Sequence, residues 1–244
     1  MKEALVIIPT YNEIENIRQI IDAVMALQDN FDVLVIDDAS PDGTQDAVEE
    51  KIQQYPERVY LTTRSGKLGL GTAYIHGFKW ALERGYAYVI EMDADFSHNP
   101  QDLPKLLEEC KKKNADVAIG SRYVSGVNVV NWPMGRVLMS YFASAYVRFV
   151  TGMPLRDSTA GFVCYKAEVL RSFDLDNIRF KGYAFQIEMK FKAWRKKFRI
   201  VEVPIIFVNR QLGTSKMNSS IFSEAVFGVL SLRLKSIFNP KSLE

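Results

Sequence analysis

Two aspartates in this chain have the residue type and the spacing of a metal–diphosphate site. Asp93 and Asp95 follow residues 86–92 (YAYVIEM), which predict a strand, and precede a polar break at residues 97–100 (SHNP). Carboxylates one residue apart at the carboxyl end of a buried strand point oxygen ligands into the crevice where open α/β sheets bind ligands. Oxygen ligands of this kind suit Mg²⁺ or Mn²⁺ carrying a diphosphate.

The same pair has two other interpretations. Aspartate is common in turns and at helix N-termini, so the pair could simply end the strand. Phosphatases of the haloacid dehalogenase type also place two aspartates one residue apart after a strand and use the first as nucleophile. That motif normally follows the first strand of its domain, whereas residues 86–92 form the fourth predicted strand here.

Polar residues also follow the first two predicted strands. Residues 9–13 (PTYNE) come after the first, and residues 37–38 (DD) come after the second. Three polar clusters therefore leave the carboxyl ends of strands on one edge of the expected sheet. Tyr11 could stack on a base, and Glu13 or Asp38 could accept hydrogen bonds from base N–H groups. Each cluster alone could cap a helix or turn the chain, but their convergence favours a nucleotide site.

The elements that must position these clusters alternate along the chain. This alternation is typical of a parallel, Rossmann-like sheet with helices on both faces. Beyond residue 121 the pattern is less regular, and no internal repeat or linker is apparent. The predicted strands are residues 5–8, 31–36, 59–62, 86–92, 117–120, 161–165 and 200–208, and the predicted helices are residues 16–27, a segment from residue 45, 72–84, 100–113 and 184–196.

Composition agrees with one large folded domain. The 244 residues are 48% hydrophobic and 25% charged, with a formal net charge of +2. Basic residues gather between residues 181 and 216, which predicts a local basic face on a protein that is not basic as a whole. We expect no nucleic-acid partner. Cys110 and Cys164 have no metal-like or redox-like neighbours, which indicates a reducing compartment. The first residues lack the shape of a signal peptide, so we expect a cytoplasmic protein.

Two segments are unusually rich in apolar residues. Residues 137–153 and 221–238 are both interrupted by charge, and neither contains 18 consecutive apolar residues. As a helix, residues 221–238 would be about 27 Å long with a polar edge, which suits a position in the membrane interface better than across hydrocarbon. The alternative is that both helices pack on the domain's own core.

Several strings resemble the polyprenol-phosphate (dolichyl-phosphate) mannosyltransferases, which are GT-A enzymes of glycosyltransferase family 2. The resemblance covers residues 4 to about 218 in the family's order. The strings are IIPTYNE, VIDDASPDGT, GLGTAYIHGF, EMDADFSHNP, GSRY, DSTAGF, GYAFQIEM and NRQLGTSK.

The resemblance implies a role for individual residues of this chain. Ser97 stands where many relatives carry Gln, so its hydroxyl would act as a weaker metal ligand. Those expected to take part in catalysis are Asp95, Arg122, Arg136 and Arg210. The nucleoside pocket would be lined by Pro9, Tyr11, Glu13, Ile36 and Asp38. The donor diphosphate would be held by Asp93, Ala94 and Asp95, and the metal by Asp93, Asp95 and Ser97. The phosphate-binding cations would be Arg122, Arg136, Arg210 and Lys216.

The implied reaction moves mannose from GDP-mannose to a polyprenyl phosphate with Mg²⁺ or Mn²⁺. The second pKa of a phosphate monoester is about 6, so at neutral pH the acceptor is already largely ionised and needs no general base. Guanidinium groups would instead offset the negative charges of the acceptor phosphate and the donor diphosphate as they approach each other. A single displacement inverts the anomeric carbon and gives polyprenyl β-mannosyl phosphate. A UDP-glucose-dependent polyprenyl-phosphate glucosyltransferase and a non-catalytic membrane-surface module are the alternatives.

The resemblance also sets expectations for the membrane side. Residues 1–218 would form the GT-A catalytic domain, including an interface helix at about 134–152. Residues 219–244 would form a C-terminal amphipathic helix without a transmembrane domain. The protein would then be peripheral on the cytoplasmic face of a membrane, or held there by a membrane-anchoring partner. His98 could touch substrate, while Asp157 and Glu188 could brace the acceptor loop.

Overall fold

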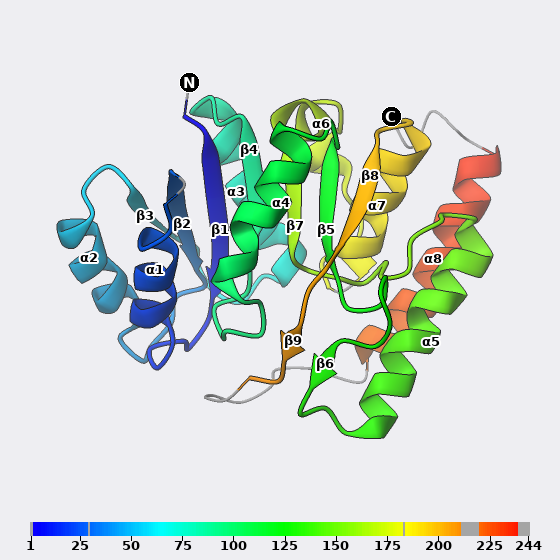
Figure 1. The fold of residues 1–244 in the computed structure, drawn as a ribbon, viewed down its shortest axis with the longest axis horizontal. Coiled ribbons are helices and arrows are strands. Elements are labelled where there is room, and N and C mark those ends of the chain that lie inside the picture. Colours follow the sequence, from blue (N-terminus) through cyan, green and yellow to red (C-terminus); the bar gives the residue numbers. More distant parts are fainter. Residues whose placement is uncertain (1, 29, 183, 211–219, 239–244) are drawn as a thin grey trace.

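The computed structural model describes residues 2–28, 30–182, 184–210 and 220–238. A seven-stranded sheet in the order β3-β2-β1-β4-β7-β5-β8 runs through the molecule with helices on both faces (Figure 1). Its neighbouring strands are parallel except where β7 pairs antiparallel with β4 and β5, so the predicted mostly parallel sheet is confirmed. The strands are β1 (Ala4–Thr10), β2 (Phe31–Asp37), β3 (Val59–Thr63), β4 (Tyr88–Glu91), β5 (Val117–Ser121), β7 (Val163–Lys166) and β8 (Ile200–Pro204).

One face of the sheet is covered by α1 (Ile17–Met25), α2 (Thr44–Gln54) and α4 (Leu103–Lys111). In α1 the apolar residues recur at helical spacing, so they form one stripe that faces the sheet. Ile17, Ile20, Ile21 and Val24 are all completely buried in this core.

The opposite face is covered by α3 (Leu70–Glu83), α6 (Ala167–Arg171) and α7 (Ala184–Arg195). Gly77 lets α3 lie directly on the strands, because a Cβ there would come within 2.7 Å of Ile7 and 2.8 Å of Ile36. The side chain of Ile36 is fully buried in this core.

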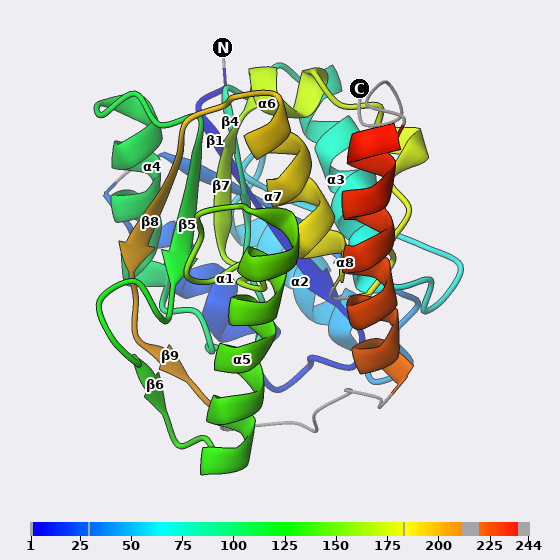
Figure 2. The same ribbon diagram turned by 90° about the vertical axis from the view of Figure 1, so that its right-hand side faces the viewer.

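Two long helices, α5 (Met134–Thr151) and α8 (Ser220–Phe238), lie side by side at one end of the molecule (Figures 1 and 2). Helix α8 also packs against α7, and its Val229 and Leu232 are buried in the same core as α3 and α7. The predicted domain division after residue 218 falls in residues 211–219, outside the described part, and stays a prediction. No helix among the described residues is both long enough and apolar enough to cross a bilayer.

The prediction of one continuous strand over residues 200–208 is wrong. Strand β8 ends at Pro204, which has no amide hydrogen to extend the ladder. The chain then leaves the main sheet, and β9 (Phe207–Val208) pairs in parallel with β6 (Val129–Val130) as a separate two-stranded sheet. Shorter 3₁₀ turns, η1 (Pro100–Asp102) and η2 (Leu175–Asn177), precede α4 and follow α6.

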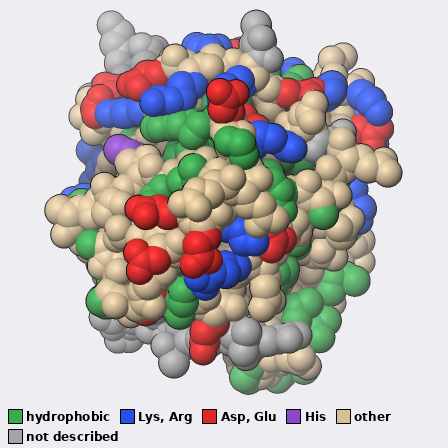
Figure 3. Space-filling model, turned by 90° about the vertical axis from the view of Figure 1, so that its left-hand side faces the viewer, with side chains coloured by type: hydrophobic (Ala, Val, Ile, Leu, Met, Phe, Trp, Pro, Cys, Tyr) green, Lys and Arg blue, Asp and Glu red, His purple; other side chains and the backbone are tan. Residues whose placement is uncertain are grey.

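The two ends of the molecule differ in their surface. The side that carries α2 and β3 shows acidic and basic side chains interspersed (Figure 3). On the opposite side, α5 and α8 expose large apolar side chains, an arrangement that often marks an interaction surface. These are Met134, Leu138, Met139, Tyr141, Phe142 and Phe149 on α5, and Leu230, Leu234 and Phe238 on α8.

Candidate active site

The predicted convergence of polar clusters is present at the carboxyl edge of the sheet. Strands β2, β1 and β4 are neighbours, and Thr10 at the end of β1 is in register with Asp37 at the end of β2. The Thr10 hydroxyl donates to Asp37 Oδ2 at 2.8 Å. Residues 11–13, 38 and 93–95 therefore leave the sheet side by side.

The two consecutive aspartates after β2 have different surroundings. Asp37 is fully buried and also accepts hydrogen bonds from the Ser40 amide at 2.8 Å and from Gln45 at 2.7 Å, so it braces the turn. Asp38 accepts from Arg64 Nε at 2.6 Å. Burial raises the pKa of Asp38, although Arg64 opposes that rise. Asp38 thus holds the segment after β3 at the site, and Arg64 is a site residue that the sequence reasoning missed.

One aspartate of the pair after β4, Asp95, contacts an arginine. Arg210 Nη2 lies 2.6 Å from Asp95 Oδ2, and Arg210 Nη1 lies 3.9 Å from Glu13 Oε1. Burial and then the charge of Asp95 raise the pKa of Asp93 to about 7. The Asp93 side chain is still 39% exposed. Three carboxylates around one guanidinium leave an excess of negative charge.

The donor set fits a hard divalent cation that arrives with a phosphorylated ligand. Among the described residues, no group of three or more His, Cys, Asp or Glu side chains is arranged to hold a metal. Asp93 and Asp95 would supply two carboxylates, which is the usual protein share for Mg²⁺ when substrate phosphates and water complete the shell. The predicted third ligand, Ser97, is buried, and its amide donates to Asp95 Oδ1 at 3.0 Å.

His98 holds the aspartate loop, residues 93–98, in place. Its Nδ1 accepts a hydrogen bond from the Asp93 amide at 3.2 Å, so that ring nitrogen carries no proton. The ring stacks on Phe162 with centroids 4.9 Å apart and meets the edge of Phe207 at 5.3 Å. Burial lowers the pKa of His98 to about 4, and the imidazole is therefore a structural acceptor in this loop.

Arg122, which follows β5, is bound to an acidic partner. Its Nε and Nη2 donate to Asp157 at 2.7 and 2.6 Å, and Nη2 also donates to Thr159 at 2.9 Å. Burial alone would raise the pKa of Asp157, but the charge and hydrogen bonds of Arg122 outweigh it and lower that pKa. Asp157 braces Arg122, and phosphate binding by Arg122 stays a prediction.

Arg136 lies in the first turn of α5 and contacts the segment that follows β9. Its Nη1 donates to Asn209 Oδ1 at 3.1 Å, and its guanidinium lies 4.1 Å from the centre of the Trp132 ring. Asn209 directly precedes Arg210, which contacts Asp95. Two consecutive residues after β9 thus connect Arg136 with the aspartate pair.

The remaining predicted residues lie around the same edge or outside the described part. Pro9 lies in β1, in register with Ile36 of β2. Lys67 Nζ lies 5.4 Å from the centre of the Tyr11 ring. Ala94 is buried between the two aspartates. Lys216 lies outside the described residues, so its phosphate role stays a prediction.

A buried cluster behind the aspartate pair was not anticipated. Lys190 of α7 is completely buried and donates to the Ala160 carbonyl at 2.6 Å and to Gln186 Oε1 at 3.0 Å. Gln186 Nε2 donates in turn to Glu91, the last residue of β4, at 2.7 Å. Burial lowers the pKa of Lys190 to about 8. Glu188 of the same helix accepts from the amides of residues 179 and 180 and is a brace.

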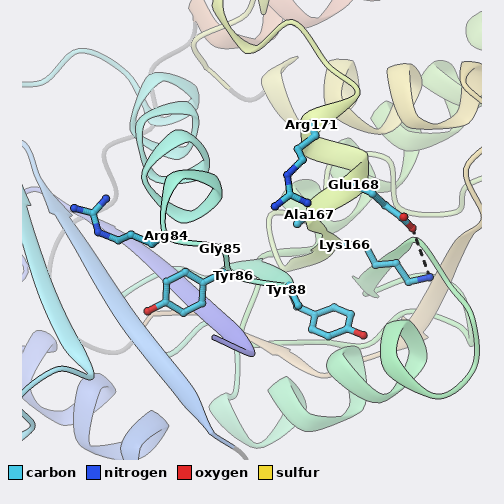
Figure 4. Close-up of a pocket in the computed structure, with 9 residues that line it drawn as sticks. Arg84, Gly85, Tyr86, Tyr88, Lys166, Ala167, Glu168 and Arg171 are labelled. Atoms are coloured by element: carbon cyan, nitrogen blue, oxygen red, sulfur yellow. Dashed lines mark ion pairs between the residues drawn. The ribbon is translucent and has the colours of Figure 1, made fainter. Parts of the chain in front are cut away.

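A hollow of about 690 Å³ lies at the other edge of the sheet (Figure 4). It is lined by Tyr88, the first residue of β4, and by Lys166 and Arg171 near α6. Asp93 lies two residues beyond Glu91, the last residue of β4, so this hollow is separate from the convergent polar clusters.

Comparison with known proteins assigns this geometry to a family. The model of "Glycosyl transferase family 2" matches residues 5–178. The chain belongs to glycosyltransferase family 2. It is therefore an enzyme that transfers a sugar, and the predicted family resemblance is confirmed, whereas the phosphatase and non-catalytic alternatives are not supported.

Curated family 2 relatives cover nearly the whole chain. An undecaprenyl-phosphate mannosyltransferase from Micrococcus luteus is 50% identical over 225 residues, which are 92% of this chain and 91% of the relative. A polyprenol monophosphomannose synthase from Mycolicibacterium smegmatis is 47% identical over 228 residues, covering 93% and 86%.

Solved structures confirm the GT-A fold of this family 2 chain. A glucosyl-3-phosphoglycerate synthase from Mycobacterium tuberculosis, solved with Mn²⁺ and UDP, superposes with a TM-score of 0.69 at 16% identity, covering 95% of this chain and 80% of the other. A mannosyltransferase from Pyrobaculum calidifontis, solved with GDP-Man and Mn²⁺, gives 0.56 at 17% identity, covering 98% and 71%.

Proposed function

We propose that this glycosyltransferase moves mannose from GDP-mannose to a polyprenyl phosphate and inverts the anomeric carbon. The observation that carries the proposal is the short connection Asp95–Arg210–Asn209–Arg136. It joins carboxylates suited to a cation–diphosphate with a guanidinium suited to a second phosphate. The names of the two curated relatives, which act on polyprenyl phosphates, support the acceptor class.

The donor would lie over the carboxyl ends of β1, β2 and β4. Asp93 and Asp95 would hold Mg²⁺ or Mn²⁺, which, when bound, would neutralise charge on the departing GDP as a Lewis acid. Arg210 would exchange its bond with Asp95 for one with the diphosphate. Tyr11 and Glu13 would face the nucleoside. The Arg64–Asp38 pair would hold the segment after β3 beside it.

The acceptor would supply the nucleophile itself. A phosphate monoester is largely dianionic at neutral pH, so the site has to bind charge rather than remove a proton. Arg122 and Arg136 would bind and orient that phosphate. The surroundings of His98 support a reaction without a general base. Its Nδ1 already accepts a hydrogen bond from the Asp93 amide, and burial lowers its pKa to about 4.

The lipid chain would run toward α5 and α8. Phe142 and Phe149 are 63% and 89% exposed and are spaced seven residues apart, which puts them on one face of α5. We infer a peripheral position on the cytoplasmic membrane face, with this side of the molecule against the lipid. Direct vesicle binding by the isolated chain would distinguish this placement from anchoring by a partner subunit.

The test is transfer of radiolabelled sugar into a lipid phase. Purified protein would receive GDP-mannose or UDP-glucose, polyprenyl phosphate, and Mg²⁺ or Mn²⁺. Incorporation from GDP-mannose only, abolished by EDTA, with a β-linkage established by NMR of the product, is the expected result. Incorporation from UDP-glucose instead would assign the alternative glucosyltransferase, and no transfer from either donor would refute the proposal.

A further inference from the structure

The acceptor side of the site contains an aromatic residue whose position suggests a direct role. Trp132 lies between β6 and α5, and its ring centre lies 4.1 Å from the Arg136 guanidinium carbon and 5.6 Å from that of Arg122. Both guanidiniums therefore lie within cation–π range of a single indole.

The indole also carries a hydrogen-bond donor. Trp132 Nε1 is buried, and among the residues that the structure describes it has no hydrogen-bond partner. Leaving a buried N–H unpaired is costly, and buried tryptophans usually find an acceptor. The neighbouring guanidiniums have only N–H groups to offer, so they cannot be that acceptor.

A bound phosphate would complete this arrangement. Its oxygens accept hydrogen bonds, and the indole N–H and the N–H groups of the two arginines packed near the same indole ring would together offer donors to a phosphate dianion. We infer that Trp132 belongs to the acceptor-phosphate subsite, where it orients Arg136 through its ring and donates Nε1–H to a phosphate oxygen. This inference rests on the proposed function, because it specifies how the proposed acceptor is held.

Packing joins the same indole to the donor side. The Trp132 ring meets Phe207 with centroids 5.2 Å apart at 69°, and Phe207 meets His98 at 5.3 Å. His98 then accepts the Asp93 amide. Pairing of Val130 with Val208 places Trp132 and Phe207 on adjoining segments. One continuous set of rings thereby connects the proposed acceptor-phosphate subsite with the aspartate loop.

The first test separates the N–H from the ring. Trp132→Phe keeps an aromatic face beside Arg136 and removes only the donor, so we expect KM for the polyprenyl phosphate to rise about tenfold, the effect of one charge-assisted hydrogen bond, with KM for GDP-mannose unchanged. Trp132→Leu should also lower kcat. Trp194→Phe, in α7 and packed on Phe191, is the matched control and should behave as the wild type.

The second test does not require sugar transfer. The chain has three tryptophans, so Trp80→Phe together with Trp194→Phe leaves Trp132 as the only indole fluorophore. We expect its emission to change on titration with farnesyl phosphate and to stay constant with farnesol, which has the same chain and no phosphate.

The outcomes distinguish the two proposals. A fluorescence response to farnesyl phosphate without transfer from GDP-mannose would keep the phosphate subsite and reject the proposed donor. Transfer in which Trp132→Phe has the wild-type KM for the lipid phosphate, with equal responses to farnesyl phosphate and farnesol, would reject the role of Trp132 and leave the proposed function intact.

Discussion

The two sides of the site, which we propose to bind the donor and the acceptor, balance their charge in different ways. On the donor side, Asp93, Asp95 and Glu13 surround one arginine, Arg210, and the pKa of Asp93 is raised to about 7. On the acceptor side, Arg122 is matched by the buried carboxylate of Asp157, whose pKa is lowered.

The difference indicates which part of the site is complete before substrate arrives. An ion pair with both partners buried and hydrogen-bonded is already satisfied, so it can set the position of a loop. A group of like charges costs free energy until a cation reduces the repulsion. The proposed acceptor side is therefore already charge-balanced, whereas on the proposed donor side the repulsion would be reduced by a cation that arrives with a diphosphate.

The largest expected effect comes from removing one donor-side carboxylate. Asp95→Asn keeps an oxygen for the Ser97 amide but loses the charge that a cation would need. We expect kcat to fall on the order of a thousandfold, the scale seen when a principal electrostatic contact is lost. Mannose transfer into lipid measures this, and an unchanged unfolding temperature would show that the fold is intact. Turnover within tenfold of the wild type would contradict the metal assignment.

The same change on the acceptor side should reduce stability. Asp157→Asn leaves Arg122 buried and uncompensated, so we expect the free energy of unfolding to fall by about 3–5 kcal/mol. Urea denaturation at neutral pH measures it. Arg18→Ala, which breaks the exposed pair with Glu50, is the control and should give no measurable change. A loss for Asp157→Asn as small as that of the control would mean that the pair is no scaffold.

The sequence predicted the position of the polar clusters at the carboxyl edge of the sheet better than it predicted the partners of the arginines. Runs of β-branched residues ending in polar clusters are local signals. They predicted that residues 11–13, 38 and 93–95 lie at the carboxyl edge of the sheet, and the structure places them there. By contrast, the Arg64–Asp38 and Arg122–Asp157 pairs join residues 26 and 35 positions apart. No periodicity specifies which carboxylate neutralises which arginine, because that choice depends on tertiary packing.

Burial of polar residues was equally hard to foresee. Lys190 belongs to a helix with many charged residues, so its sequence context predicts a solvated side chain, yet it is completely buried beneath the 157–160 loop. His98 was a candidate for substrate contact, and only the packing of Phe162 and Phe207 around it defines it as a brace. The break between β8 and β9 did have a local signal, Pro204, which the apolar run around it obscured.

A third variant divides acceptor binding from donor binding. Arg136→Ala removes the guanidinium beside Trp132 and Asn209, so we expect KM for polyprenyl phosphate to rise at least about tenfold while KM for GDP-mannose stays the same. Steady-state kinetics with each substrate varied in turn measures this. Arg148→Ala, near the other end of α5, controls for the loss of one positive charge. Equal kinetic constants for the Arg136 variant and the wild type would exclude it from the acceptor side.

The pH dependence of stability should follow the sign of the Asp157 shift. The pKa of this group is lower in the folded state than in the unfolded chain, where it is about 3.9. Its contribution is fully present above the unfolded value and is lost as pH falls through the folded value. The stability gap between the wild type and Asp157→Asn should therefore be constant from pH 7 to about pH 5 and narrow below about pH 4. Denaturation series for both proteins measure the gap, and a gap that widens in acid would contradict the assignment.

The smallest expected effect is at the surface of α5. Phe142→Ser removes one exposed aromatic side chain from the face that we place against lipid, and partial loss of such burial should weaken vesicle binding a few-fold. Co-sedimentation with anionic liposomes measures the affinity. Asp95→Asn is the matched control, since it should bind vesicles as the wild type does while transferring no sugar. If Phe142→Ser bound equally well, and Phe149→Ser with it, the apolar face of α5 would have another occupant, and the lipid would have to reach Arg136 from a different side.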